Sequence, residues 1–196
     1  MTPRIDDRRV AVLVANEGIE QVELTEPWKA IREAGGQLRL VAPDSGPVQA
    51  MNHLDKADTF TVDQQVSDAD PDDYDALLLP GGVANPDNLR MNAAAVNFAR
   101  SFVDAGKPVA AICHAPWTLV EADVLRGRTL TSYPSLQTDI RNAGGTWVDE
   151  EVHTDRGLVT SRTPDDLPAF CAKMVEEIAE GVHPVRPEGA SAPGSG

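Results

Sequence analysis

Short, uninterrupted apolar runs alternate with amphipathic stretches along most of this chain, and this pattern constrains the fold more than any other feature. Residues 10–15 (VAVLVA), 76–79 (ALLL) and 109–112 (VAAI) lack the polar–apolar alternation of a strand with one face in water. Strands of this kind are buried on both faces, as in a parallel sheet that helices cover on either side. The sequence therefore predicts an α/β protein with a mainly parallel sheet between two helical layers.

The spacing of apolar residues and helix-ending glycines places the individual elements. The expected elements are a strand over 9–16, a helix over 22–34, a strand over 37–42, an irregular hairpin within 47–65, a strand over 76–79, a helix over 92–105, strands over 109–112 and 129–132, a helix over 136–143, strands around 147–153 and 158–161, and a last helix. Thr163 is expected to cap that last helix and Pro164 to open it.

The length of 196 residues suits one domain. We expect an α/β domain over residues 9–181, preceded by a short extension, 1–8. Residues 182–196 hold almost no apolar side chain that could offset the entropy of ordering, so they are expected to form a flexible tail.

The excess of acidic over basic residues disfavours anionic partners. The chain has 17 Lys and Arg residues against 31 Asp and Glu residues, a net charge of −14, which repels nucleic-acid backbones and anionic membranes. The start lacks the apolar core of a secretion signal, and no apolar run approaches the ~20 residues of a membrane span, so a cytoplasmic location is expected. Glycine-rich phosphate loops and Cys-x-x-Cys or His-Glu-x-x-His metal motifs do not occur, so we expect neither cofactor nor metal.

Cys113 is the strongest candidate for a chemically reactive residue. It follows the strand over 109–112 directly and precedes a helix that carries Pro116 in its first turn. Reactive groups in open parallel sheets collect at the carboxyl ends of strands, and a helix amino terminus favours the thiolate. A small buried hydrophobe is the alternative, and position alone leaves both open. Cys171 instead belongs to an apolar helical stripe and is interpreted as core.

Three further residues fall at the same edge of the predicted sheet. His114 is a candidate base, proton carrier or backbone N–H donor, and the alternative is a histidine satisfied by a local carbonyl. Glu20 follows the first strand, and a protonated carboxyl there would stabilise a thiolate, provided its pKa is raised. Glu17 and Glu23 are interpreted as acidic residues at a helix amino terminus. Gly82 permits close backbone approach, so its amide and that of His114 are a candidate oxyanion hole; the alternative is a plain tight turn.

Four separated segments, 15–24 (ANEGIEQVEL), 72–82 (DDYDALLLPGG), 106–116 (GKPVAAICHAP) and 161–168 (SRTPDDLP), together resemble the PfpI-type branch of the parkinsonism-protein superfamily. The resemblance runs from about residue 9 to residue 181. It implies a flavodoxin-like sandwich related to class I glutamine amidotransferases, with Cys113 as the nucleophile, His114 as its adjacent histidine, Glu20 as the carboxyl that contacts the thiol and Gly82 as the oxyanion-hole glycine.

The resemblance also implies an oligomer. Relatives form homodimers or larger assemblies, and in protease-type relatives an acidic residue from a neighbouring subunit orients the histidine. Asp87 occupies the matching position here, where the family typically has Glu. The shorter side chain departs from the pattern.

The family implied by the resemblance is functionally mixed, so several functions stay open. The leading hypothesis is a stress-protection enzyme, without a cofactor, in which Cys113 acts on 2-oxoaldehydes or their protein adducts as a glyoxalase or deglycase. The alternatives are an intracellular cysteine peptidase and a non-enzymatic redox sensor or chaperone that works through oxidation of Cys113. Glutamine amidotransferase chemistry is disfavoured, because the only His-Pro pair, at 183–184, lies close to the tail.

Overall fold

The structure is a computed structural model that describes residues 3–184 of the chain. Its described part contains a seven-stranded sheet in the order β11-β12-β8-β7-β1-β3-β6. The bounds of these strands are β1 Arg9–Leu13, β3 Gln37–Ala42, β6 Gln64–Gln65, β7 Ala76–Leu79, β8 Val109–Ile112, β11 Val152–Asp155 and β12 Leu158–Ser161. All neighbouring pairs are parallel except β11 and β12, which are antiparallel.

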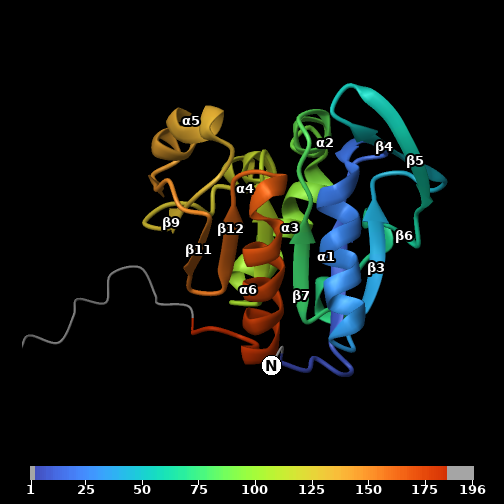
Figure 1. Ribbon diagram of the computed structural model, residues 1–196, viewed down its shortest axis with the longest axis horizontal. Coiled ribbons are helices and arrows are strands. Elements are labelled where there is room, and N and C mark those ends of the chain that lie inside the picture. Colours follow the sequence, from blue (N-terminus) through green and yellow to red (C-terminus); the bar gives the residue numbers. More distant parts are fainter. Residues whose placement is uncertain (1–2, 185–196) are drawn as a thin grey trace, which may run out of the picture.

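Helices cover both faces of this sheet, and the strand residues alternate between two cores (Figure 1). Val10 and Val12 of β1 pack towards α1 (Gln21–Glu33) and α6 (Leu167–Glu180). Ala11 and Leu13 of the same strand pack towards α3 (Ala93–Asp104), α4 (Pro116–Glu121) and α5 (Gln137–Asn142). Because both faces are apolar and buried, the strands need no polar side, and the predicted flavodoxin-like α/β class is confirmed.

Two small sheets extend the main one. β2 (Glu17–Glu20) pairs in parallel with β4 (Pro47–Asn52), which pairs with β5 (Asp55–Thr61) to form a projecting hairpin. β9 (Thr129–Leu130) pairs with β10 (Thr146–Trp147). Figure 1 places the β4–β5 hairpin beside the short helix α2 (Ala84–Leu89), at one end of the sheet.

Several local expectations need correction. The segment 17–20 forms β2, and α2 was not expected at all. The segment around 147–153 divides between β10 and β11. Thr163 makes no side-chain capping bond, and a turn of 3-10 helix over Pro164–Asp166 precedes α6. Cys171 is half-buried and packs against the edge of the core. The expected flexible tail lies outside the described residues from 185 onwards. Within residues 3–184, no helix has the length and apolarity to cross a bilayer.

One buried amide ties together the ends of two central strands. Asn85, in α2, accepts a hydrogen bond from Ala15 N–H at 2.7 Å, just after β1. Its Nδ2 donates to the carbonyls of Pro80 at 2.8 Å and Gly81 at 3.1 Å, just after β7. The side chain is fully buried, so it supplies the hydrogen bonds that these loops cannot obtain from water.

Replacing Asn85 with alanine should therefore be costly. Asn85→Ala leaves one buried N–H and two carbonyls without this partner, and we expect the free energy of unfolding to fall by about 2–4 kcal/mol. Asn88→Ala, in the same helix at an exposed position, should change it by no more than about 0.5 kcal/mol. Urea denaturation measures both, and equal effects of the two substitutions would contradict the bridging role.

Candidate active site

Cys113 sits on a sharp turn between β8 and α4. Its φ of 64° is in the left-handed region, which costs a residue with a Cβ roughly 1–2 kcal/mol. Main-chain bonds hold it there: Cys113 N–H donates to Ser161 O at 3.0 Å, and Tyr133 N–H donates to Cys113 O at 2.9 Å. The thiol is therefore presented by a conformation that the two neighbouring segments maintain.

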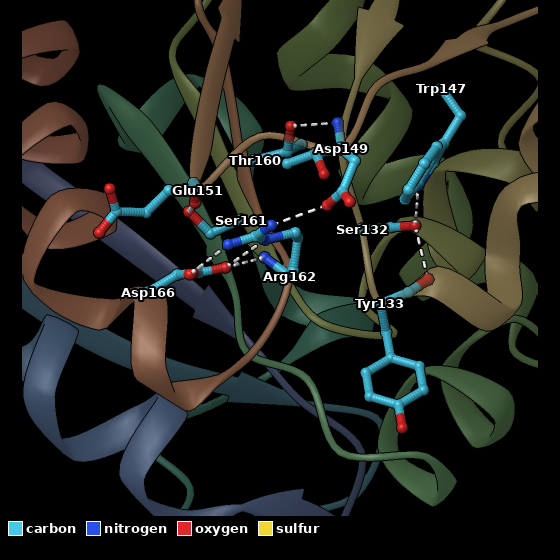
Figure 2. A network of polar contacts seen from close by, with 10 residues as sticks. Ser132, Tyr133, Trp147, Asp149, Glu151, Thr160, Ser161, Arg162 and Asp166 are labelled. Atoms are coloured by element: carbon cyan, nitrogen blue, oxygen red, sulfur yellow. Dashed lines mark hydrogen bonds and ion pairs between the residues drawn. The ribbon is translucent and has the colours of Figure 1, made fainter.

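A polar network fixes those two segments (Figure 2). Arg162 lies between two carboxylates, with Nη1 2.7 Å from Asp149 Oδ1 and Nε 2.9 Å from Asp166 Oδ2. This anchors the chain directly after Ser161. Trp147 Nε1 donates to Ser132 Oγ at 3.0 Å, directly before Tyr133. Ser161 and Tyr133, the two hydrogen-bond partners of the Cys113 backbone, are thus each held in place by contacts of the residue next to them in the chain.

The Gly81–Gly82 loop passes close to the cysteine because neither residue has a side chain. A Cβ on Gly81 would lie 2.7 Å from Cys113 Cβ and would overlap the carboxylate of Glu23. Gly82 has a φ of +82°, and a Cβ there would overlap the carbonyl of Gly18. The backbone amides of Gly82 and His114 face the Cys113 sulfur, and their hydrogen bonds act to lower its pKa. These are the two amides predicted as an oxyanion hole, a role that stays a prediction.

The carboxyl beside the thiol belongs to Glu23, so the predicted contact of Glu20 is wrong. Glu20 ends β2, and its Oε2 accepts a hydrogen bond from His53 N–H at 3.0 Å, in the turn of the β4–β5 hairpin. Glu23 is the third residue of α1 and shares that helix's buried face with Pro27 and Ile31. The helix start therefore turns Glu23, fully buried, towards Gly81 and Cys113.

The two buried groups perturb each other. Burial raises the pKa of Glu23 to about 7, while the neighbouring Cys113 thiol and the loop amides oppose the rise. Burial also raises the pKa of the Cys113 thiol, and an ionised Glu23 raises it further. The activation expected from the helix dipole does not dominate, since α4 has only six residues.

The pair can nevertheless hold a thiolate without changing its total charge. Once the pair has lost one proton, the remaining proton can sit on either Sγ or the Glu23 carboxyl. With the proton on Glu23, the thiolate faces a neutral acid, and the amides of Gly82 and His114 favour this form. A carboxyl that titrates at about 7 is suited to this exchange.

His114 lies on the other side of the sulfur. Its Nδ1 is 3.1 Å from Cys113 Sγ, and its Nε2 is 3.4 Å from Ser135 Oγ. The ring stacks on Tyr133 with centroids 4.5 Å apart, and burial lowers the pKa of the imidazole. The sequence predicted His114 but not Tyr133, which lies in a loop, or Ser135, which lies in the following 3-10 turn over Pro134–Leu136.

Asp87 lines the same cavity, but it does not reach His114 within the described part of this chain. Its carboxylate is exposed and pairs with Arg90 at 3.2 Å, and the Arg90 guanidinium lies over the Trp117 ring at 5.0 Å. The predicted role of Asp87 at a neighbouring subunit's site stays a prediction.

A cavity of about 800 Å³ opens onto the cysteine. Cys113 keeps 7% of its surface exposed there. The β4–β5 hairpin forms one wall with His53 and Leu54, and Tyr133 lies on another side. Since ligand cavities commonly measure ~300–1,000 Å³, this one is large enough for a small molecule or a modified side chain.

The fold and this site define a class: a flavodoxin-like α/β protein with a cysteine on the turn after a central strand, between a buried glutamate and a histidine. The DJ-1/PfpI family model matches residues 8–177, and the chain belongs to that family.

Named relatives cover most of the chain. It is 43% identical to "Protein/nucleic acid deglycase 2" of Escherichia coli, over 83% of this chain and 93% of that protein. It is 42% identical to "Putative cysteine protease YraA" of Bacillus subtilis, over 83% of this chain and 94% of that protein. A two-domain protein from Anabaena variabilis, with DJ-1/ThiJ/PfpI-like and ferritin-like domains, matches with a TM-score of 0.83 and 29% identity. That match covers 88% of this chain but only 48% of the larger one.

Replacing Glu23 should reveal its raised pKa as a dependence of stability on pH. Because the folded state keeps the Glu23 proton up to about pH 7 and the unfolded state releases it near 4.5, wild-type stability falls as the pH rises between these values. Glu23→Gln removes this loss, on the order of 3 kcal/mol, so the variant should gain stability relative to wild type between about pH 5 and pH 8.

Urea denaturation at the two pH values measures the change, with Glu26→Gln, at an exposed position of the same helix, as the matched control. A gap between Glu23→Gln and wild type that stays constant over this range would contradict the assignment.

Proposed function

We propose that this protein is a cysteine-dependent enzyme that acts on 2-oxoaldehydes or on their adducts with protein side chains, as a glyoxalase or deglycase. The observation that carries the proposal is the buried Glu23 carboxyl, with a pKa of about 7, next to Cys113 at the cavity. Such a pair supplies a nucleophile and an acid from one shared proton. The relative named as a deglycase supports the same class of chemistry.

The proposed reaction is redox-neutral and needs no cofactor. The Cys113 thiolate attacks the aldehyde carbon, and the carbonyl electrons pass to the oxygen, which takes the Glu23 proton. Glu23 or His114 then removes the hydrogen on that carbon as a proton while the adjacent carbonyl oxygen gains one, which gives an enediol. A proton returns to the former carbonyl carbon, and the hydroxyl on the sulfur-bearing carbon loses its proton as the C=O of the thioester forms. The product is a 2-hydroxy thioester. Water hydrolyses it to a 2-hydroxy acid and restores the thiol.

In this proposal, the backbone amides of Gly82 and His114 stabilise the negative charge that develops on the carbonyl oxygen. They face the sulfur, so they also face the oxygen of a carbonyl that bonds to it. Tyr133 stacks on His114 and holds the imidazole plane beside the reacting carbon. The acidic balance of the chain favours small carbonyls and protein adducts over nucleic acid as substrates.

A peptidase is the second candidate, because one relative carries that name. It requires a partner that orients His114, and among the described residues Nε2 makes its side-chain contact, at 3.4 Å, with the hydroxyl of Ser135 rather than with a carboxylate. Asp87 of this chain is engaged by Arg90. We therefore place the peptidase second.

Lactate production from methylglyoxal tests the leading proposal. Cys113→Ser should reduce the rate to background, and Glu23→Gln should reduce kcat by ~10²–10⁴-fold, the usual effect of losing a general acid or base. Cys171→Ser, at the edge of the core on α6, should retain wild-type turnover.

Equal lactate yields from Cys113→Ser and wild type would refute the proposal. Cleavage of an unfolded protein substrate that depends on Cys113, without lactate formation, would favour the peptidase instead. Selective oxidation of Cys113 by dilute peroxide in a protein that shows neither turnover would favour a redox sensor.

A further inference from the structure

The last turn of α6 carries a group of ionisable side chains that is separate from the cysteine site. Glu177, Glu180 and His183 each offer one ligand atom, and these three atoms lie within 4.8 Å of one another. The start of α6 is near the cavity, which Pro164 lines, and a 14-residue helix is about 21 Å long. Figure 1 shows the end of α6 on the side of the molecule opposite α2 and β4.

Glu177 is buried without adequate compensation. Its side chain is only 8% exposed, and its Oε2 is 3.0 Å from Nε2 of His183. The two atoms are not aligned as a hydrogen bond, and neither has another hydrogen-bond partner among the described residues. A buried carboxylate oxygen in this state is costly unless His183 is protonated or a cation binds between the two side chains.

The negative charges near Glu177 also favour a bound cation. Glu180 lies one helical turn beyond Glu177, at the carboxyl end of α6, where the helix dipole disfavours negative charge. The nearby Lys173 forms its close ion pair, at 2.6 Å, with Glu176 instead. A divalent cation would balance both Glu177 and Glu180.

His183 is held in place independently of the two glutamates. Its N–H donates to Gly106 O at 2.8 Å. Its ring packs on the turn between β11 and β12, so closely that a Cβ on Gly157 would lie 2.7 Å from His183 Cδ2. The imidazole is therefore positioned before any ion binds, which reduces the entropic cost of binding.

We propose that Glu177, Glu180 and His183 bind one Zn²⁺ or a similar divalent transition-metal ion. One imidazole nitrogen and two carboxylate oxygens suit such an ion, and water would complete a tetrahedral site. The ion would join the end of α6 to the chain that packs on the β11–β12 turn. Its role is structural, and it is independent of the reaction at Cys113.

We expected no metal because the sequence lacks Cys-x-x-Cys and His-Glu-x-x-His motifs. The spacing Glu-x-x-Glu-x-x-His is neither of these motifs, so the motif search could not indicate this site. Two of the three residues also lie beyond position 177, where the match to the family model ends.

Calorimetric titration of Zn²⁺ into the chelator-treated, full-length Cys113→Ser protein tests the site, since this background removes a competing thiol ligand. We expect saturable one-to-one binding. His183→Ala and Glu180→Gln should each weaken it at least about tenfold, because even partners outside the first coordination shell contribute ~10–100-fold to metal affinity. Glu180 is exposed, so Glu180→Gln keeps the test valid if His183→Ala impairs folding.

His153→Ala provides the matched control. His153 also pairs with a glutamate, Glu150, at 2.7 Å, but outside the proposed site. Its removal should leave Zn²⁺ affinity unchanged, and Zn²⁺ should raise the Tm of this control and not that of His183→Ala. Absence of one-to-one binding, or equal affinity in His183→Ala and His153→Ala, would overturn the proposal.

Discussion

The burial of the Glu23 carboxyl against the Cys113 thiol is the interaction on which the rest of the site depends. A carboxyl at a helix amino terminus ordinarily ionises easily, because the helix dipole favours its charge by ~0.3–1 kcal/mol. Here burial outweighs the dipole and raises the pKa of Glu23 to about 7. The same burial raises the pKa of the thiol, so neither group reaches its reactive state alone. Their proximity allows one proton to serve both.

The surrounding fold maintains that proximity. Gly81 leaves room for the glutamate and the cysteine on either side of it, and any Cβ there would push them apart. Asn85 holds the glycine loop to the end of β1. Ser161 and Tyr133 keep the Cys113 backbone in its left-handed conformation. The left-handed backbone at Cys113 is thus held by two segments, at Tyr133 and Ser161, and its closeness to Glu23 is held by the glycine loop.

The architecture was predictable from the sequence because it depends on short-range patterns. The run 10–15 has no polar side because both of its faces are buried, and Gly35 ends α1 as expected. The choice between Glu20 and Glu23 was not predictable in the same way. It depends on the residue at which α1 begins, and sequence patterns locate helix ends only to within one or two residues. A signal did exist: Glu23 falls four residues before Pro27 and eight before Ile31, on the buried face.

Other features required the tertiary structure. In the sequence, Asn85 is an ordinary polar residue after a glycine-rich turn. It can hydrogen-bond to the ends of both β1 and β7 only because the fold brings these two strands together. Tyr133 reaches His114 from a loop 19 positions away in the chain. His183 approaches Glu177 because the chain turns back after α6 at Gly181, whose φ is 84°. These contacts join segments whose relative positions are set by the whole sheet.

The pH dependence of the rate at which iodoacetamide alkylates Cys113 tests the shared proton most directly. Wild-type protein and Glu26→Gln, a substitution at an exposed position of the helix that carries Glu23, should both show a rise in rate centred near pH 7, where the buried pair loses its first proton. In Glu23→Gln this rise should move away from pH 7, because no carboxyl remains to exchange a proton with the thiol. A Glu23→Gln profile that coincides with the wild-type profile would contradict the account.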